Sequence, residues 1–344
     1  MMKRSALHSS HLADHGVSPV PTLVAPLASP LGAAFAGGFL GCLVTLVLTA
    51  IGVMSSLASA STTAALCGAF LITRTARCLS GAFFPALYGG TFGGMTSVAS
   101  LTHITPSHSV TLTVGLFVAL SIVCGFAFLV ATRVDARSVV PIASGYGGRL
   151  GMIAAIASFI FIDLAQRLLG AHSTLLPGIR AASIPEPNML ALKLGACMAG
   201  TFVTFLIFRL AAVAEAGSPE RIYIASAVAV SGLALLSIFH SNSIGTSGDF
   251  YAGCFLGTSS SERLTGWRQT AFGAVVLTAT LPLVRAIFPD LGGGLGLAAF
   301  FTVAFVSAVS RVVAMTWDFV HDGRPSVNRL RVHWLSRMAS RDRR

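Results

Sequence analysis

The sequence predicts an all-α polytopic membrane protein, with about ten membrane segments in two inverted five-segment repeats. Three observations lead to this prediction. The 344 residues are 54% hydrophobic and only 10% charged, whereas soluble globular chains are about 25% charged. Apolar stretches close to the ~20 residues that span a bilayer as a helix recur along the chain. One glycine-rich motif occurs twice.

The elements follow in chain order. Residues 1–30 form a polar, proline-containing arm that we expect to be disordered and cytoplasmic. Its His8, His11, His15 and Asp14 fit a solvated tail better than a metal-binding tract. Ten apolar segments then follow, at 31–55, 58–73, 79–101, 110–132, 150–169, 189–213, 222–240, 243–262, 269–288 and 292–315. The loops between them are mostly short, which leaves no room for a separate soluble domain.

The third and eighth segments are the least hydrophobic and carry the repeated motif. "YGGTFGGMTS" begins at Tyr88 and "YAGCFLGTSS" begins at Tyr251, 163 positions later, with five of the ten positions identical. The same offset aligns Gly32–Phe39 with Gly195–Phe202 without a gap, and Tyr146–Met152 resembles Leu291–Leu297 at offset 145. Two matches in one ungapped register indicate an internal duplication.

This duplication sets the domain boundaries. We expect a first membrane repeat at 31–169, an extracytoplasmic linker at 170–188, a second membrane repeat at 189–315 and a basic cytoplasmic tail at 316–344. Because each repeat has an odd number of segments, the second repeat is inverted relative to the first.

Arginine placement tests the inversion independently. With the N-terminus in the cytoplasm, the inner loops receive Arg74, Arg77, Arg133, Arg137, Arg149, Arg209, Arg221, Arg263 and Arg268. The outer loops carry few Lys or Arg, which is a positive-inside pattern. It requires both motif segments to cross the membrane. If the two motif segments are re-entrant, only eight segments cross the membrane, and the two repeats have the same orientation.

The basic tail and the cysteines bear on partners. The net charge is +11, and seven arginines lie within the last 21 residues: Arg324, Arg329, Arg331, Arg337, Arg341, Arg343 and Arg344. Contact with anionic lipid at the inner leaflet is favoured over nucleic acid. Ser326–Arg341 is expected to form a short surface helix. The six cysteines form no C-x-x-C pair, so neither disulfides nor a metal site is predicted.

The motif segments are too polar and glycine-rich to face lipid, so they should be buried or line a wet cavity. Pro85 with Gly89–Gly90, and Gly245, Gly248 and Gly253, are expected to break the two helices near the bilayer midplane. Freed carbonyls and hydroxyls can then coordinate a cation, or helix N-termini can hold an anion. The candidate substrate or ion path comprises Tyr88, Gly90, Phe92, Gly94, Thr96, Ser97, Asp249, Tyr251, Gly253, Phe255, Gly257, Ser259 and Ser260.

Packing alone explains the same glycines. Gly90 with Gly94, and Gly253 with Gly257, form GxxxG pairs that let helices cross closely. The two segments can therefore be a crossing pair at the centre of the bundle without forming a site.

Charged residues inside the apolar segments are few. Asp249 is a candidate for proton or cation coupling, or it lies at the outer water interface. Asp163 and Arg167 have the i,i+4 spacing of an ion pair, which we expect to be structural. Arg209, Arg285 and Arg311 lie near segment ends and are expected to extend to the interface.

The leading function is a transporter or channel-like permease for a small solute or ion, in the cytoplasmic (inner) membrane of a bacterium. A non-catalytic assembly subunit of a membrane complex is the alternative, and formation of a homo-oligomer stays open. An intramembrane enzyme is less favoured, because the chain lacks H-E-x-x-H and no nucleophile lies beside an evident base. No cofactor is predicted.

Overall fold

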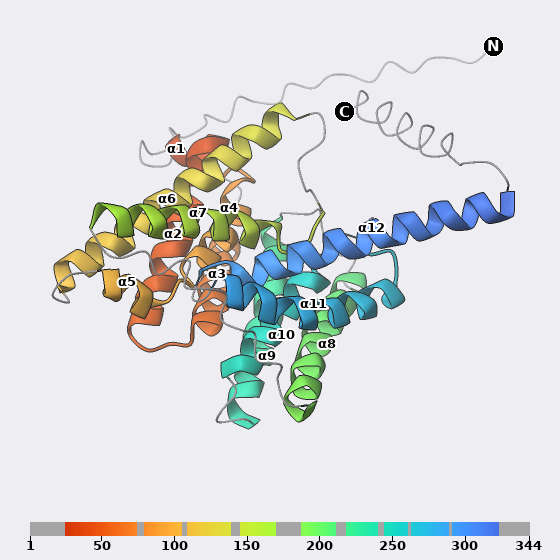
Figure 1. The fold of residues 1–344 in the computed structure, drawn as a ribbon. Coiled ribbons are helices and arrows are strands. Elements are labelled where there is room, and N and C mark those ends of the chain that lie inside the picture. The colour runs from red at the N-terminus through yellow and green to blue at the C-terminus, as the bar shows by residue number, and fades with distance from the viewer. Residues whose placement is uncertain are drawn as a thin grey trace, which may run out of the picture.

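The computed structural model describes residues 25–73, 79–104, 109–138, 145–169, 187–210, 218–239, 244–260, 263–288 and 291–322, and these are all-α (Figure 1). Eight helices in this part of the chain are long and apolar enough to cross a membrane. They are α2 (Pro30–Ala50), α3 (Ser55–Ile72), α6 (Val110–Arg137), α7 (Arg149–Leu168), α8 (Pro187–Leu210), α9 (Pro219–Phe239), α11 (Trp267–Ile287) and α12 (Gly294–Asp322). These helices bear out the prediction that the chain is an integral membrane protein.

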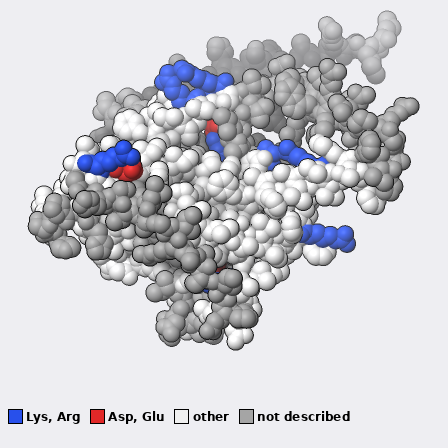
Figure 2. All heavy atoms as spheres, in the orientation of Figure 1, with Lys and Arg blue, Asp and Glu red and all other residues white. Residues whose placement is uncertain are grey.

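The outer surface of the bundle suits lipid. Large apolar side chains on the long helices are half exposed, among them Val114 at 53%, Phe126 at 54%, Ile160 at 55% and Phe301 at 52%. On the face that Figure 2 shows, the described Lys, Arg, Asp and Glu residues form a few separate groups on an otherwise uncharged surface. Such a surface is unfavourable in water and favourable in a hydrocarbon solvent.

The two motif segments form shorter helices than the other eight expected segments. The first is α4 (Phe83–Gly93), followed by an irregular stretch and by α5 (Val98–Ile104), and the second is α10 (Ile244–Gly257). At 1.5 Å per residue, α4 is about 17 Å long and α10 about 21 Å, less than the ~30 Å hydrocarbon core of a bilayer. Neither helix spans a membrane alone.

The expected positions of the helix breaks were wrong. Helix α4 is continuous through Pro85 and Gly89–Gly90, because a proline in the first turn removes no intrahelical hydrogen bond. Helix α10 is likewise continuous through Gly245, Gly248 and Gly253. The first segment is instead interrupted at residues 94–97, between α4 and α5.

Each motif helix packs along a long helix of its own half of the chain. Helix α4 lies against α2, and α10 lies against α8. The two halves are joined by α3 against α9 and by α7 against α12. Helices α7 and α12 begin beside each other, each after a glycine in the left-handed region: Gly148 with φ 83° and Gly293 with φ 86°. An added Cβ on Gly148 would lie 2.2 Å from the carbonyl oxygen of Gly296, so both the backbone conformation and the close approach require glycine.

The ends of the chain differ from the expected boundaries. Helix α12 continues to Asp322, past residue 315, and its C-terminal part extends beyond the rest of the bundle (Figure 1). A short helix, α1 (Ala25–Ala28), lies inside the arm that was expected to be disordered, and Ser29 caps α2 by accepting a hydrogen bond from the Gly32 N–H. The predicted tail helix, residues 1–24, most of the 170–188 linker, and Arg74 and Arg77 lie outside the described residues.

Candidate functional site

Four aromatic side chains from the two motif helices form one buried cluster. Within α4, the rings of Tyr88 and Phe92 have centroids 4.6 Å apart, and within α10 those of Tyr251 and Phe255 are 4.5 Å apart. Between the helices, Phe92 lies 4.7 Å from Phe255 and 6.3 Å from Tyr251, and Tyr88 lies 6.3 Å from Phe255. The closest contact between the two helices therefore joins the second ring of each, Phe92 and Phe255, and each tyrosine lies farther out beside the phenylalanine of the other helix. All four side chains are at most 7% exposed.

A chain of buried hydroxyl groups links this cluster to α3. Ser59 Oγ donates to Thr91 Oγ1 at 2.8 Å and lies 3.0 Å from the Tyr251 hydroxyl. Thr63 Oγ1 lies 3.4 Å from Thr91 Oγ1, and Thr91 also donates to the Tyr88 carbonyl. Sequence reasoning missed Ser59, because its contact with Tyr251 joins positions 192 residues apart.

The four motif glycines face α2 and α8 rather than each other. An added Cβ would lie 2.2 Å from the Gly38 carbonyl oxygen at Gly90, and 2.3 Å from the Cys197 carbonyl oxygen at Gly253. Gly94 and Gly257 approach Thr45 of α2 and Thr204 of α8 in the same way. The GxxxG pairs therefore bring each motif helix against its neighbour, and the contacts between α4 and α10 come from the rings.

The four candidate hydroxyls after the motif helices differ in their partners. Thr96 donates to the Gly93 carbonyl and accepts from the Gly292 N–H at 3.2 Å, so it holds the break in place. Ser97 accepts from the Ser100 N–H, and Ser259 accepts from the Gly147 N–H at 3.1 Å. Ser260 Oγ is buried and has no hydrogen-bond partner among the described residues.

Asp249 is buried within the bundle. Its side chain is 2% exposed and forms an ion pair with Arg285 of α11 at 2.8 Å. Arg285, expected to extend to the interface, instead points inward to this carboxylate. Asp163 and Arg167 form an ion pair at 2.9 Å on the outside of α7, with 32% and 74% of their side chains exposed.

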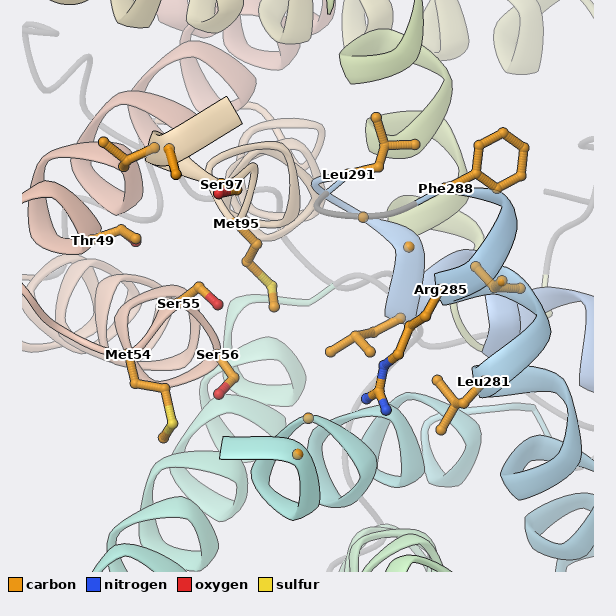
Figure 3. A pocket seen from close by; sticks show the side chains of 18 of the residues that line it. Thr49, Met54, Ser55, Ser56, Met95, Ser97, Leu281, Arg285, Phe288 and Leu291 are labelled. Carbon is orange, nitrogen blue, oxygen red and sulfur yellow. The ribbon is translucent and has the colours of Figure 1, made fainter. Parts of the chain in front are cut away.

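A cavity lined by described residues, here called the Arg285 cavity, has a volume of about 860 Å³. It is lined by the start of α3, the residues after α4, the start of α10 and the N-terminus of α12. Figure 3 shows Arg285 and Met95 reaching into this space, with Ser56 and Ser97 on its α3 and α5 sides.

The second cavity, here called the Arg221 cavity, has a volume of about 480 Å³. It is lined by Pro85 and Tyr88 of α4, residues 257–260 at the end of α10, the N-terminus of α7 and three arginines: Arg149, Arg209 and Arg221. The arginines were noticed in the sequence only as topology markers, because no local pattern shows that they meet in one cavity.

The two cavities lie at opposite ends of the α4–α10 pair. The Arg285 cavity contains the C-terminal side of α4 and the N-terminus of α10, through Ser97 and Gly245. The Arg221 cavity contains the beginning of α4 and the C-terminal end of α10, through Pro85 and Ser260. Helices α4 and α10 therefore run in opposite directions between the two cavities. Tyr88, Phe92 and Phe255 of the aromatic cluster line the Arg221 cavity, and none of the four rings lines the Arg285 cavity.

Comparison of the chain with protein families, with curated proteins and with solved structures finds no match. Among the described residues, no group of three or more His, Cys, Asp or Glu side chains is arranged to hold a metal ion. The functional argument therefore rests on the two cavities, the rings between them and the charges that line them.

Proposed function

We propose that the protein is a membrane transporter or channel-like permease for a small solute or ion, whose path follows the α4–α10 pair. One observation carries the proposal: two partly polar cavities lie at opposite ends of the α4–α10 pair. Tyr88, Phe92 and Phe255 line the Arg221 cavity, and the Arg285 cavity begins at Met95 and Gly248, each three residues from a ring of the cluster. A path through a membrane needs water-accessible space on both sides and a barrier between them. That barrier is formed by four rings, those of Tyr88, Phe92, Tyr251 and Phe255. Rotation of any one ring would widen or narrow the passage between the two cavities.

The positions of the cavities support a ten-segment topology. The Arg285 cavity is lined by residues 52–56, by Met95 and residues 97–99, and by Phe288, Leu291 and residues 293–295, which the arginine pattern assigns to the outer side. The Arg221 cavity is lined by 145–150 and 257–260, which the same pattern assigns to the cytoplasmic side. If the motif segments were re-entrant, residues 145 and 260 would be on opposite sides of the membrane, yet the Ser260 N–H donates to the Gly145 carbonyl at 3.0 Å.

An inverted pseudo-two-fold relation between the halves fits the same contacts. Gly147, before α7, approaches the Phe255 carbonyl of α10, while Gly292, before α12, approaches the Phe92 carbonyl of α4. Helices α2 and α8 also fit this relation, but the residues that contact the motif helices differ by four positions from those that the sequence alignment pairs. Gly90 lies on Gly38, whereas Gly253 lies on Cys197, and the aligned partner of Gly38 is Thr201. The alignment of Gly32–Phe39 with Gly195–Phe202 is therefore offset by one helical turn from the spatial pairing.

Flux into liposomes that contain the purified protein tests the proposed function. Protein-dependent movement of at least one class of small solute (anion, cation or neutral) is expected, and it should fall when the aromatic barrier is filled by Phe92→Trp. No protein-dependent flux of any class, from protein that elutes as a single folded species, contradicts a transport function.

Cysteine labelling tests the topology. A cysteine introduced at position 106 or 176 should react with an impermeant reagent from outside, and one at position 218 only after permeabilisation. The re-entrant arrangement predicts the opposite result at all three positions.

An assembly subunit is the second candidate, and the end of α12 favours it. Val312, Val313, Met315 and Trp317 are 50–64% exposed on the part of α12 that extends beyond the bundle (Figure 1). This stretch is a contact surface for lipid or for another membrane protein. Truncation after residue 311 separates the two functions: an assembly subunit loses its partner, and a permease keeps its flux.

A further inference from the structure

No carboxylate among the described residues on the wall of the Arg221 cavity balances its positive charge. Arg149, Arg209 and Arg221 line it, and the described lining residues include no Asp or Glu. In the Arg285 cavity, by contrast, the arginine is paired with Asp249 at 2.8 Å. The two ends of the α4–α10 pair therefore differ in charge.

The contacts of the three arginines show which of their charges have no carboxylate partner among the described residues. Arg149 is paired with Asp135 of α6, which offsets its charge. Arg221 instead donates to the Thr258 carbonyl at 3.5 Å, and its guanidinium lies 4.6 Å from the centre of the Phe208 ring. Arg209 donates to the Thr265 carbonyl at 3.3 Å, and its guanidinium lies 5.1 Å from the centre of the Phe205 ring. Carbonyls and rings orient a guanidinium, but they leave its net charge in place.

An unpaired guanidinium inside a membrane bundle is unfavourable. Removing a cation from water without a counter-charge costs several kcal/mol, and cations within membrane segments face cavities or pair with anions. Arg221 is only partly exposed and lies in the first turn of α9. An anion in the cavity would supply the missing counter-charge, and the planar fork of arginine suits oxyanions and carboxylates.

Other polar groups on the cavity wall also favour binding of an anion. Ser260 lines the cavity, and its Oγ is buried beside the cavity without a hydrogen-bond partner among the described residues. Helix α7 begins in the cavity wall at Gly148 and Arg149, and no side chain caps its N-terminus. The free N–H groups of a helix N-terminus carry partial positive charge. These features add to the arginines and do not carry the argument alone.

We propose that the transported solute is a small anion, and that the Arg221 cavity is its vestibule and first binding site. The proposal rests on the proposed transport function and adds the substrate class. Arg221 and Arg209 attract and hold the anion, and Ser260 donates a hydrogen bond to it. The aromatic cluster then separates this site from the Arg285 cavity, where the Asp249–Arg285 pair presents no net charge.

Flux in liposomes made of neutral lipid tests the substrate class. Proteoliposomes loaded with potassium chloride, nitrate, acetate or phosphate are diluted into a medium without that anion. Valinomycin lets potassium balance the charge, and anion efflux is recorded. Parallel vesicles measure rubidium uptake and glycerol permeation. Anion efflux that exceeds rubidium uptake is the expected result, and the order among the four anions identifies the preferred chemistry.

Substitution of the arginines assigns the effect to the cavity. Arg221→Gln should lower anion efflux on the order of tenfold, because it removes a charge facing a partly shielded space, and Arg209→Gln should lower it on the order of threefold, because Arg209 is exposed and water screens its charge. Arg221→Lys keeps the charge and should retain most of the flux. Arg268→Gln is the matched control, since Arg268 is exposed over the Trp267 ring and does not line the cavity. Arg209 is exposed, so its substitution tests the proposal even if Arg221→Gln fails to fold.

The outcomes separate the two proposals. Wild-type flux of rubidium or glycerol without anion flux overturns the anionic substrate and leaves transport intact. Absence of all protein-dependent flux contradicts the transport function itself. Equal anion flux in wild type, Arg209→Gln and Arg221→Gln means that the arginines serve only topology, and it also overturns the proposal.

Discussion

The Arg285 cavity and the Arg221 cavity are built from similar parts but carry different charge. Each is lined by one end of α4, the opposite end of α10 and the glycine-led N-terminus of a long helix, α12 or α7. In the first, Asp249 neutralises the arginine. In the second, Arg209 and Arg221 contact carbonyls and rings instead. Similar backbone geometry thus surrounds one cavity whose arginine is paired with a carboxylate and one cavity in which two arginines have no carboxylate partner among the described residues. Under the proposed function, this asymmetry would give the path a direction.

The largest expected effect tests whether the two motif helices are packed equally tightly against their neighbours. Gly90→Ala and Gly253→Ala should each destabilise the protein by about 3 kcal/mol, because the new Cβ meets a backbone oxygen at 2.2 or 2.3 Å. Thermal unfolding in detergent measures the loss. Gly195→Ala is the matched control, since no heavy atom would lie within 4 Å of its Cβ. A large loss at one motif glycine and none at the other would break the equivalence of the two motif helices.

The next prediction removes the neutral pair from the Arg285 cavity. Asp249→Asn leaves Arg285 unpaired beside a buried amide and should cost about 2 kcal/mol, below the usual loss for a fully buried pair because Arg285 is partly exposed. Asp163→Asn, in a surface pair on α7, should cost at most about 0.5 kcal/mol. Unfolding temperatures of both variants check this difference.

The flux of Asp249→Asn sharpens the comparison between the cavities. With Asp249 neutralised, both cavities carry net positive charge, so anion efflux should persist or rise in the folded fraction. Loss of flux with normal folding would mean that Asp249 acts directly in coupling. Restoration of stability in Asp249→Asn/Arg285→Gln would show that the cost of the single change comes from the unpaired arginine.

The sequence was sufficient for the long helices but not for the tertiary pairing. Apolar segments located eight helices, because a bilayer-length run of apolar residues has few other structures available. The Asp249–Arg285 pair joins two different helices, and no local spacing indicates it. The break in the first motif segment was misplaced because Pro85 lies in the first helical turn, where it is tolerated. The grouping of Arg149, Arg209 and Arg221 depends on how three helices meet, which composition does not encode.

A smaller effect distinguishes the two motif tyrosines. Tyr251→Phe removes a hydroxyl that lies 3.0 Å from Ser59 Oγ and should cost about 1 kcal/mol. Tyr88→Phe should cost less, because Tyr88 lines the Arg221 cavity, where water can solvate its hydroxyl. Both variants keep the ring that forms the barrier, so neither should open a leak. Thermal unfolding gives the stabilities, and glycerol permeation detects a leak.

The smallest stability effect belongs to Ser260→Ala, and it decides whether the end of α10 is a site or a packing element. Ser260 Oγ lacks a hydrogen-bond partner among the described residues, so its removal should leave the unfolding temperature unchanged or slightly raised. If the hydroxyl donates to an anion in the Arg221 cavity, the anion concentration for half-maximal efflux should rise on the order of 10- to 100-fold, since a hydrogen bond to a charged group contributes roughly 1.5–3 kcal/mol. Ser97→Ala is the counterpart in the Arg285 cavity. It removes the hydroxyl that accepts the Ser100 N–H, so it should lower stability slightly and leave that concentration unchanged. If Ser97→Ala, Ser260→Ala and Asp249→Asn all keep wild-type flux and ion dependence, the motif residues serve packing and the path lies elsewhere in the bundle.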